Sequence, residues 1–385
     1  MKLILQKPHK TQQYLLDNKS RVNVVCLGRR AGKSCLAQHL LIHSALRGES
    51  SAYYAPTYKM LAEIWREIKQ RLGDTIKISS ETEKRIELLT GGTIDFWSLD
   101  TPDSSRGRKY HLVVVDEAAI IDCLEEAWTE AIRPTLTDYK GEAWFLSTPK
   151  GHNFFWQLWS NDHTAAFQMP TTCNPYIDPQ EVEAARRDMT ERSFRQEYLA
   201  EFLEESGGVF QGVDAVSTLE INLLKDADSY TMGVDLGQIN DYTVISVLNS
   251  RAEQVYISRF NNRSWDRIEA EIEEVAKLYD ANVIVEKNFN PKVVEDLENM
   301  GLRVTPFSTT AQSKPMIIEA LAAAIEHKEI TLLNDSTQRE ELKAFEYKNN
   351  GKMGAPGSSN DDCVLALAIA YQGLRSKKSY YISFA

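Results

Sequence analysis

The sequence has few cysteines, no long apolar run and no excess of positive charge, and each shortage excludes a class of protein. Its five cysteines among 385 residues are scattered and odd in number. This argues against a disulfide framework and a structural zinc site, and it indicates a reducing compartment. No stretch approaches the roughly 18 apolar residues of a membrane helix, and the N-terminal apolar run is too short for a signal peptide. We therefore expect a soluble intracellular protein without membrane contact.

Positive charge is also in short supply. Lys and Arg number 44 against 55 Asp and Glu, so the formal net charge is −11. Up to residue 206 the chain has 26 basic and 29 acidic residues, and afterwards it has 18 and 26. A protein wrapped passively around nucleic acid is basic, so any DNA contact must be local. With 43% hydrophobic and 26% charged residues, the composition is globular, and the length suffices for two or three cores.

The first half of the chain alternates apolar β-type runs with helical periodicity, which predicts βαβ units on a largely parallel sheet. The expected strands are 22–27, 51–55, 93–99, 112–115 and 143–146, and the expected helices are 34–45, 59–72 and 179–205. The last helix is rich in charge, so we expect it to lie across a surface or to form a small subdomain. The Ser-Gly-Gly sequence at 206–208 is the expected interdomain hinge.

After residue 212 the order of the elements changes. Three closely spaced β-type runs at 230–236, 243–249 and 254–259 resemble an antiparallel meander. A helix at 265–279, an apolar strand at 283–285 and helices at 291–300, 315–327 and 361–374 follow, with a flexible loop at 349–360. This order predicts an α/β chain with domains at 1–206 (a lid or linker subdomain at about 169–206) and 207–375, and a tail at 376–385.

A phosphate-binding loop is predicted between the first strand and the helix after it. The loop consists of Gly28, Arg29, Arg30, Ala31, Gly32, Lys33 and Ser34. Backbone N–H groups at such a helix start wrap phosphates, the lysine neutralises the β and γ oxygens, and the serine hydroxyl ligates Mg²⁺. Position 27, where the usual pattern has its first glycine, is Leu27, and the glycine comes one place later. A strand-to-helix turn without a ligand is the alternative for such a loop taken alone.

Two further strands end in residues suited to nucleotide hydrolysis. Asp116 and Glu117 follow an apolar strand, which would place Asp116 near the Mg²⁺ and let Glu117 polarise the attacking water as a general base. The alternative is the first turn of a surface helix. Ser147 and Thr148 end another strand and are suited to sensing the γ-phosphate at the same sheet edge.

Hydrolysis also needs a cation near the leaving charge. Arg29, Arg30, Arg106 and Arg108 are the candidates, and a solvated surface arginine is an equal alternative for each. Gln13, upstream of the loop, is a candidate for reading the adenine edge, with a polar residue on a surface helix as the alternative.

Carboxylates end or open several elements of the second half. Asp235 lies in an apolar strand, which is a costly place for a charge without a cation. Asp241 precedes the next strand, Glu286 ends a further apolar strand, and Asp361 and Asp362 open an apolar helix. Three acids from two strands and a helix start can hold two divalent metals for phosphodiester cleavage, and oxygen ligands favour Mg²⁺ or Mn²⁺. Taken singly, Asp361 could merely cap a helix and Glu286 could pair with Lys287.

These motifs, in this order, resemble the large terminase subunit of tailed bacteriophages. This packaging motor joins a P-loop (ASCE-type) ATPase domain to a ribonuclease-H-like (RuvC-like) nuclease with a mixed sheet. The resemblance covers nearly the whole chain, and the displaced glycine is common in the family. It rests on the loop at 28–34, the acidic strand at 113–118, the Leu-Ser-Thr-Pro motif at 146–149, the lid-like segment at 194–200 with 208–210, and the acids at 233–237 and 361–362.

The resemblance implies ATP-driven translocation of double-stranded DNA into a procapsid and endonuclease cuts that start and end packaging. It implies ATP hydrolysis by Lys33, Ser34, Asp116 and Glu117, coupling through Ser147 and Thr148, and an arginine acting in cis or from a neighbouring subunit. It gives the nuclease metals, two Mg²⁺ or Mn²⁺ ions, to Asp235, Glu286 and Asp362, with Asp241 and Asp361 in support.

The resemblance also implies partners. They are the portal of the procapsid, a small terminase subunit and further copies of the chain in a ring, commonly a pentamer, with a monomer as the solution form. The expected location is the host cytoplasm, with transient docking on the portal. Two other classes stay open at this point: a cellular repair or recombination ATPase fused to a RuvC-like junction nuclease, and an ATP-gated DNA scaffold with an inactive nuclease.

Overall fold

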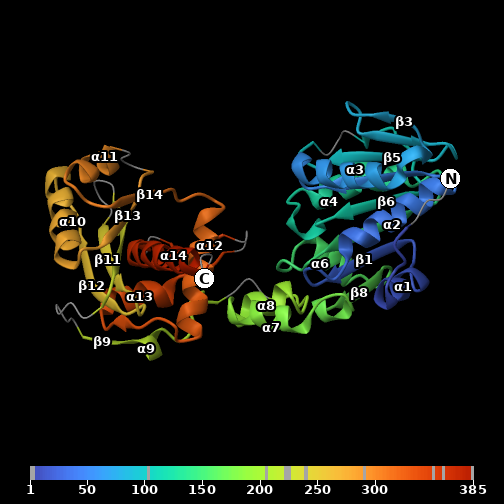
Figure 1. The fold of residues 1–385 in the computed structure, drawn as a ribbon. Coiled ribbons are helices and arrows are strands. Elements are labelled where there is room, and N and C mark those ends of the chain that lie inside the picture. Colours follow the sequence, from blue (N-terminus) through green and yellow to red (C-terminus); the bar gives the residue numbers. More distant parts are fainter. Residues whose placement is uncertain are drawn as a thin grey trace. The chain divides into compact units, whose positions relative to one another are not determined.

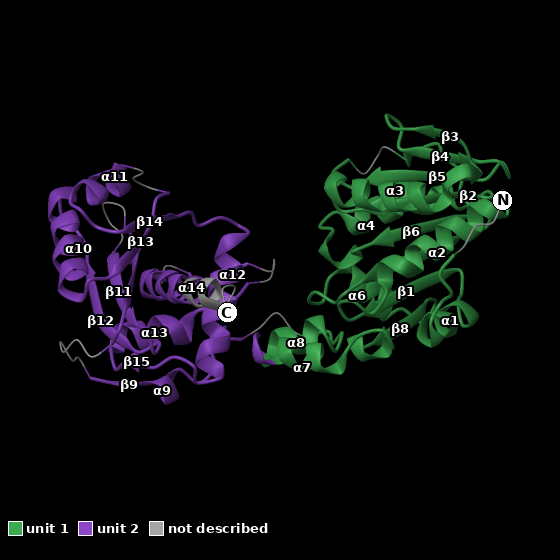
Figure 2. Cartoon of the chain, viewed as in Figure 1, with its two compact units in different colours: residues 1–186, 191–204 green, residues 187–190, 205–385 purple. Residues whose placement is uncertain are grey.

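In a computed structural model of the chain, the structure describes residues 5–101, 105–203, 207–220, 227–237, 242–288, 292–348, 352–357 and 360–382. The chain forms two compact units, residues 1–186 with 191–204 and residues 187–190 with 205–385 (Figure 2). The predicted boundary after residue 206 adjoins 204–206, outside the described residues, and the 169–206 subdomain and the 376–385 tail stay predictions. None of the described helices is long and apolar enough to cross a membrane.

The first unit is built on an eight-stranded sheet of order β3-β4-β5-β2-β6-β7-β1-β8 (Figure 1). From β5 to β8 all neighbours are parallel, and β3 and β4 add an antiparallel edge. Parallel neighbours bring the carboxyl ends of β6, β7 and β1 to one edge. The strands are β1 (Val22–Leu27), β2 (Ser50–Ala55), β3 (Ile76–Ser80), β4 (Arg85–Leu88), β5 (Thr93–Ser98), β6 (Leu112–Asp116), β7 (Glu142–Ser147) and β8 (Ala165–Met169).

Helices cover both faces of this sheet, because successive strand residues point to opposite faces. α2 (Lys33–Leu46) and α3 (Tyr58–Leu72) pack on the face that carries Val25 and Leu27. The face that carries Val24 and Cys26 packs against η4 (Ala127–Ile132) and α6 (Phe154–Trp159). The remaining helices are α1 (Lys10–Asp17), η1 (Gly73–Thr75), η3 (Ala118–Ile120), α4 (Leu124–Glu126), α5 (Arg133–Thr135), η5 (Thr171–Cys173), α7 (Pro179–Arg187) and α8 (Glu191–Glu197).

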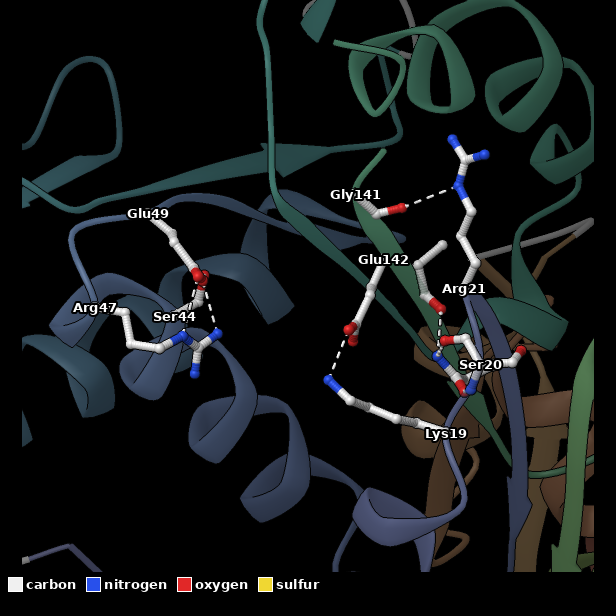
Figure 3. A network of polar contacts seen from close by, with 10 residues as sticks. Lys19, Ser20, Arg21, Ser44, Arg47, Glu49, Gly141 and Glu142 are labelled. Carbon is white, nitrogen blue, oxygen red and sulfur yellow. Dashed lines mark hydrogen bonds and ion pairs between the residues drawn. The ribbon is translucent and has the colours of Figure 1, made fainter. Parts of the chain in front are cut away.

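The opposite edge of the sheet, where β1 and β7 begin, carries a network of ion pairs (Figure 3). Lys19 pairs with Glu142, and Arg47 pairs with Glu49, each with a nitrogen–oxygen distance of 2.6 Å. Arg21 donates to the carbonyl of Gly141 at 3.4 Å. Because these charges pair with one another near solvent, they add little to stability.

The second unit contains a five-stranded sheet of order β12-β11-β10-β13-β14. β12, β11 and β10 are antiparallel, and β13 and β14 add in parallel on the other side of β10. The strands are β10 (Tyr230–Asp235), β11 (Thr243–Asn249), β12 (Gln254–Phe260), β13 (Asn282–Glu286) and β14 (Val304–Phe307). Two short pairs accompany this sheet: β9 (Ser217–Leu219) with β15 (Leu332–Leu333), and β16 (Glu346–Tyr347) with β17 (Met353–Gly354).

Helices again cover both faces. α10 (Trp265–Tyr279) and α11 (Lys292–Asn299) pack on the face that carries Met232 and Val234. On the other face α14 (Asp362–Ile382) crosses β10 so closely that a Cβ at Gly233 would collide with backbone atoms of Ala366 and Ala370. α12 (Ser313–Glu326) packs beside α14, and α13 (Ser336–Ala344) and α9 (Val213–Val216) complete the unit.

The structure differs from the predicted elements in several helices and several strands, and the helices α1, α6 and α13 were not predicted. The helix predicted at 179–205 is wrong as a single element, because α7 ends at Arg187 and α8 runs only from Glu191 to Glu197. Thr190 precedes α8 as a capping-type residue, and Glu191 supplies an acid in its first turn. The short strands β3, β4, β8 and β14 were not predicted. The predicted flexible loop at 349–360 lies partly outside the described residues and contains β17.

Candidate active sites

The predicted phosphate loop lies at the carboxyl edge of the first sheet. Gly28, Arg29, Arg30, Ala31 and Gly32 connect β1 to α2, which begins with Lys33 and Ser34. The ends of β6 and β7 lie beside it, because Asp116 pairs with Leu146 and Cys26 pairs with Ser147. The structure thus brings together the lysine, the two acids and the Ser147 strand end from three separate segments.

Residues 169–174 and 197–198 pack against the phosphate loop, and we call these two segments the clasp. Arg29 donates its N–H to the carbonyl of Glu197 at 2.7 Å, and its guanidinium pairs with the Glu197 carboxylate at 2.6 Å. The Thr171 hydroxyl donates to the Arg29 carbonyl at 2.8 Å. A Cβ on Gly28 would lie 2.5 Å from the Tyr198 carbonyl oxygen and 2.6 Å from the Thr171 nitrogen. The displaced glycine therefore has a local reason, since only glycine allows this approach.

Lys33 and Asp116 are buried, and half-buried Glu117 lies beside them. The Lys33 ammonium donates to the carbonyls of Leu27 and Gly28 at 3.1 and 3.2 Å. Burial lowers the pKa of Lys33, and the carboxylates of Glu117 and Asp116 oppose this shift. Burial raises the pKa of the Glu117 carboxyl, with Lys33 in opposition. A raised carboxyl pKa suits a general base, because it brings proton affinity closer to the working pH.

Asp116 is held in a defined orientation. The Tyr53 hydroxyl donates to one of its carboxylate oxygens at 2.9 Å, and the Glu117 N–H donates to the other at 3.0 Å. Glu117 has a left-handed backbone with φ of 48°, and Arg30 has φ of 58°. Such backbones are strained for residues with side chains and concentrate at functional sites. A pocket lined by Ser34, Tyr53, Asp116 and Glu117 opens beside them.

The remaining predicted residues of this site are Ser147, Thr148 and the candidate arginines Arg106 and Arg108. Ser147 is buried, and its hydroxyl accepts the Ala119 N–H at 3.1 Å. Thr148 follows it at the strand end. Arg106 pairs with Glu130 at 2.9 Å, and the Arg108 guanidinium lies 5.9 Å from the Trp97 ring centre. Neither contact brings an arginine to the loop, so the choice of arginine stays a prediction.

Gln12, and not Gln13, contacts the loop. The Gln13 amide donates to Asp17 at 2.8 Å on the exposed side of α1. The Gln12 amide donates to the Gly32 carbonyl at 2.9 Å, and its oxygen accepts the His9 N–H at 3.1 Å. The signal that could have found Gln12 is its position three residues after His9, where a glutamine closes a capping box.

The acids of the second unit converge on its mixed sheet. Asp235 ends β10 and Glu286 ends the parallel neighbour β13, and their side chains are 5% and 3% exposed. Burial raises the pKa of Asp235 well above its usual range, and the adjacent Glu286 carboxyl adds to this shift. Across the described residues, no lysine or arginine forms an ion pair with either acid. Two facing carboxylates without a cation are unfavourable unless a proton or a metal ion lies between them.

Asp361 and Asp362 lie at the start of α14, on the same side of the sheet. Lys314 pairs with Asp361 at 2.8 Å, and the Asn360 amide donates to Asp362 at 2.9 Å. The Asn288 amide donates to Glu286 at 3.0 Å and to the Thr309 carbonyl at 2.7 Å. Asp241, the remaining predicted ligand, lies outside the described residues.

The donor set fits a hard divalent cation. The candidate ligands are carboxylate oxygens, and the electrostatic effect of Asp361 and Asp362 on Asp235 shows that they lie in its neighbourhood. Over the described residues, no three His, Cys, Asp or Glu side chains already stand close enough together to hold a metal.

Comparison with known proteins decides the family. The sequence profile described as "Terminase large subunit, T4likevirus-type, N-terminal" matches residues 24–216, half of the chain. The chain belongs to the terminase large-subunit family. The large terminase of Thermus virus P23-45 is 28% identical over 442 residues, which cover 100% of this chain and 91% of the relative.

Solved structures agree on the fold. Two crystal structures of the large terminase from one thermophilic bacteriophage, the second in complex with ADP, superpose with TM-scores of 0.67 and 0.65 at 14% identity. They cover 95% and 94% of this chain, and 99% and 97% of those chains. The predicted α/β fold, with a largely parallel sheet in the first unit and a mixed sheet in the second, is confirmed. As a large terminase, the chain is an ATPase and nuclease.

Proposed function

We propose that this large terminase hydrolyses ATP to translocate double-stranded DNA into a procapsid, and that its second unit cuts the DNA at the start and end of packaging with two Mg²⁺ or Mn²⁺ ions. The observation that carries the proposal is the pair of separate acidic groups, buried Asp116 with half-buried Glu117 beside Lys33, and buried Asp235 with Glu286. Family membership favours this reading over a cellular repair ATPase and over a scaffold with an inactive nuclease.

In the first unit we assign hydrolysis to the loop and the two acids. Backbone N–H groups of residues 28–34 and the Lys33 ammonium would bind the phosphates, while Ser34 and Asp116 would hold Mg²⁺. Glu117 would take a proton from the attacking water, a role for which burial raises its pKa. Ser147 would couple the site to its surroundings, since its hydroxyl accepts an N–H of η3, directly after Glu117. The large terminase solved in complex with ADP supports ATP as the nucleotide.

The nuclease assignment gives Asp235, Glu286 and Asp362 to the metals, with Asp361 and Asp241 in support. Metal ions bound there would activate water and stabilise the leaving oxygen. The chain itself supplies orientation: Asn288 holds Glu286, Asn360 holds Asp362, and the sheet register sets Asp235 beside Glu286. A neutral amide donor orients a carboxylate without cancelling the charge that attracts a cation.

Glu117→Ala tests the ATPase assignment. Loss of a general base should lower ATP turnover by roughly 100-fold or more, and Lys33→Ala should abolish turnover, while metal-dependent DNA cleavage persists in both. Glu125→Ala removes an exposed acid of the same unit and should leave turnover unchanged. ATP hydrolysis at the wild-type rate in Glu117→Ala would contradict the base assignment.

Plasmid nicking in Mg²⁺ or Mn²⁺ tests the nuclease assignment. Asp362→Ala should abolish cutting and leave ATP hydrolysis in place, whereas Glu340→Ala, which removes an exposed acid of α13, should cut normally. The nuclease assignment would be contradicted by a wild-type chain that never nicks, or by an Asp362→Ala chain that nicks as well as wild type.

Family membership also supports the proposed partners. These are the portal and procapsid, a small terminase subunit that selects DNA, and further copies of this chain in a ring, a pentamer in the proposal, that assembles from monomers in the host cytoplasm. Sedimentation of the chain with and without portal protein and ATP would test the ring, because a chain that stays monomeric on the portal would contradict it.

A further inference from the structure

The start of α14 has an unusual cap. The Asp361 carbonyl accepts the Leu365 N–H at 3.0 Å, which makes Asp361 the N-cap residue. An N-cap aspartate ordinarily turns its carboxylate onto the N–H groups two or three residues ahead. Here the Cys363 N–H, two residues ahead, instead donates to the carboxylate of Glu341 at 2.8 Å. Glu341 belongs to α13, another helix, so α14 is capped from outside.

The remote cap leaves the carboxylates of α14 available for other contacts. The Asp361 carboxylate faces the Lys314 ammonium at 2.8 Å, and the Asp362 carboxylate receives the Asn360 amide at 2.9 Å. If the Cys363 N–H lacked Glu341, the Asp361 carboxylate would be its nearest substitute in the usual capping geometry. That rotation would withdraw Asp361 from Lys314 and alter the start of the helix that carries Asp362.

Glu341 is itself held in place. Its side chain is 8% exposed, and its second oxygen lies 3.2 Å from the Arg259 guanidinium. Arg259 in turn stacks on the Tyr242 ring at 3.4 Å. The sheet register places Arg259 in the same cross-strand row as Val244 and Asp235, with β11 between them. Side chains directly opposite in antiparallel strands share a face, so this support lies on the face that carries Asp235.

We propose that Glu341 is a positioning residue of the nuclease site: by capping α14 from α13, it takes the capping role that the Asp361 carboxylate would otherwise fill and fixes the helix start that carries Asp362 in the orientation for a divalent metal. This inference rests on the proposed nuclease function. A purely structural cap would stabilise α14 without changing metal affinity, and the two roles therefore separate in a binding measurement.

The test is Mn²⁺ binding to the nucleotide-free full chain, followed by the electron paramagnetic resonance signal of free Mn²⁺. Glu341→Ala should weaken Mn²⁺ binding on the order of tenfold, the scale of losses when an outer partner of a metal ligand is removed. Glu340→Ala, the exposed neighbour on the same helix, should bind within about twofold of wild type. Thermal unfolding in EDTA reports the structural cost of each variant separately.

Wild type and Asp235→Asn separate the two proposals. If Asp235→Asn binds Mn²⁺ like wild type, the proposed metal site itself is wrong. If Asp235→Asn loses binding while Glu341→Ala keeps wild-type affinity, whatever its unfolding temperature, only the positioning role is overturned.

Two conservative variants keep the test open should Glu341→Ala fail to fold. Glu341→Gln retains an oxygen that accepts the Cys363 N–H, so its Mn²⁺ affinity should stay near wild type, and a tenfold loss would overturn the proposal. Glu341→Asp retains the charge beside Arg259 but is one methylene too short to reach the N–H. It should lose Mn²⁺ affinity like Glu341→Ala, and unchanged affinity would overturn the proposal.

Discussion

The carboxylates of Asp235 and Asp361 have different neighbouring groups. Asp235 is buried against Glu286, while Asp361 pairs with Lys314. Asp235→Asn removes a buried carboxyl that must either repel Glu286 or take up a proton, and the new amide can donate to Glu286. We expect the metal-free chain to gain roughly 1–3 kcal/mol in free energy of unfolding at pH 7.5. The measurement is urea denaturation in EDTA.

Asp361→Asn is the matched control for this stability gain. It breaks a favourable pair and should lower the free energy of unfolding by about 1 kcal/mol. Equal losses in the two variants would show that the Asp235 carboxylate is not under repulsion. The added stabilisation by Mn²⁺ seen in wild type should be absent in Asp235→Asn, since ligand binding to the folded state is what supplies it.

Tyr53 and Tyr54 offer a second contrast between adjacent residues. Both are buried on β2 and point to opposite faces, and only the Tyr53 hydroxyl donates to Asp116. Tyr53→Phe should raise the Mg²⁺ concentration for half-maximal ATP hydrolysis on the order of tenfold, because Asp116 loses an orienting donor. Tyr54→Phe should leave this concentration unchanged. Identical magnesium titrations for both variants would contradict the role of Tyr53.

The helix α14 and the strand β10 are in close contact at Gly233. Gly233→Ala places a methyl group against the backbone of α14. The helix can move away from this methyl group only by shifting Asp362, which lies at its start. We expect a loss of roughly 1–3 kcal/mol in free energy of unfolding together with slower nicking. Gly208→Ala is the control, because its new Cβ would lie 3.5 Å from the nearest atom. A Gly233→Ala chain as stable as the control would show that the helix can move away.

Elements with strong local signals were predictable, and elements stabilised by distant partners were not. β1, β6 and β10 are apolar runs that end in, or lead directly into, candidate site residues, so pattern alone located them. β3 and β4 are short and partly exposed, and only pairing along a sheet edge makes them strands. The same limit applied in the sites: Lys33 and Asp116 belong to local motifs, whereas Glu341 acts on a helix start 22 residues away.

At the scale of the whole molecule, the half-buried His39 makes stability depend on pH. The ring of His39 lies against the ring of His43, tilted by 38°, with 4.1 Å between ring centres. Burial, and then His43, lowers the pKa of His39 from 6.5 to about 4. As the pH falls below 6.5, His39 takes up a proton in the unfolded chain, whereas in the folded chain it stays neutral until about pH 4. The contribution of His39 to the free energy of unfolding is therefore fully present above pH 6.5 and decreases as the pH falls toward 4.

His39→Asn should reduce this pH dependence. Urea denaturation at pH 7.5 and pH 5 should show a smaller difference in free energy of unfolding than in wild type. His163→Asn changes an exposed histidine of the same unit and should keep the wild-type difference. An unchanged difference in His39→Asn would mean that other groups set the acid sensitivity.

The clasp around the phosphate loop has a thermodynamic consequence. The 169–174 segment and Glu197 hydrogen-bond directly to the backbone of Gly28, Arg29 and Arg30. A ligand that favours one arrangement of the loop must then favour one arrangement of these segments. This coupling is reciprocal: if the ligand changes the affinity for a partner that displaces the segments, the partner changes the affinity for the ligand by the same factor. A force that displaces the segments likewise changes the affinity for the ligand. Mechanical load on the clasp is therefore equivalent to a change in nucleotide concentration.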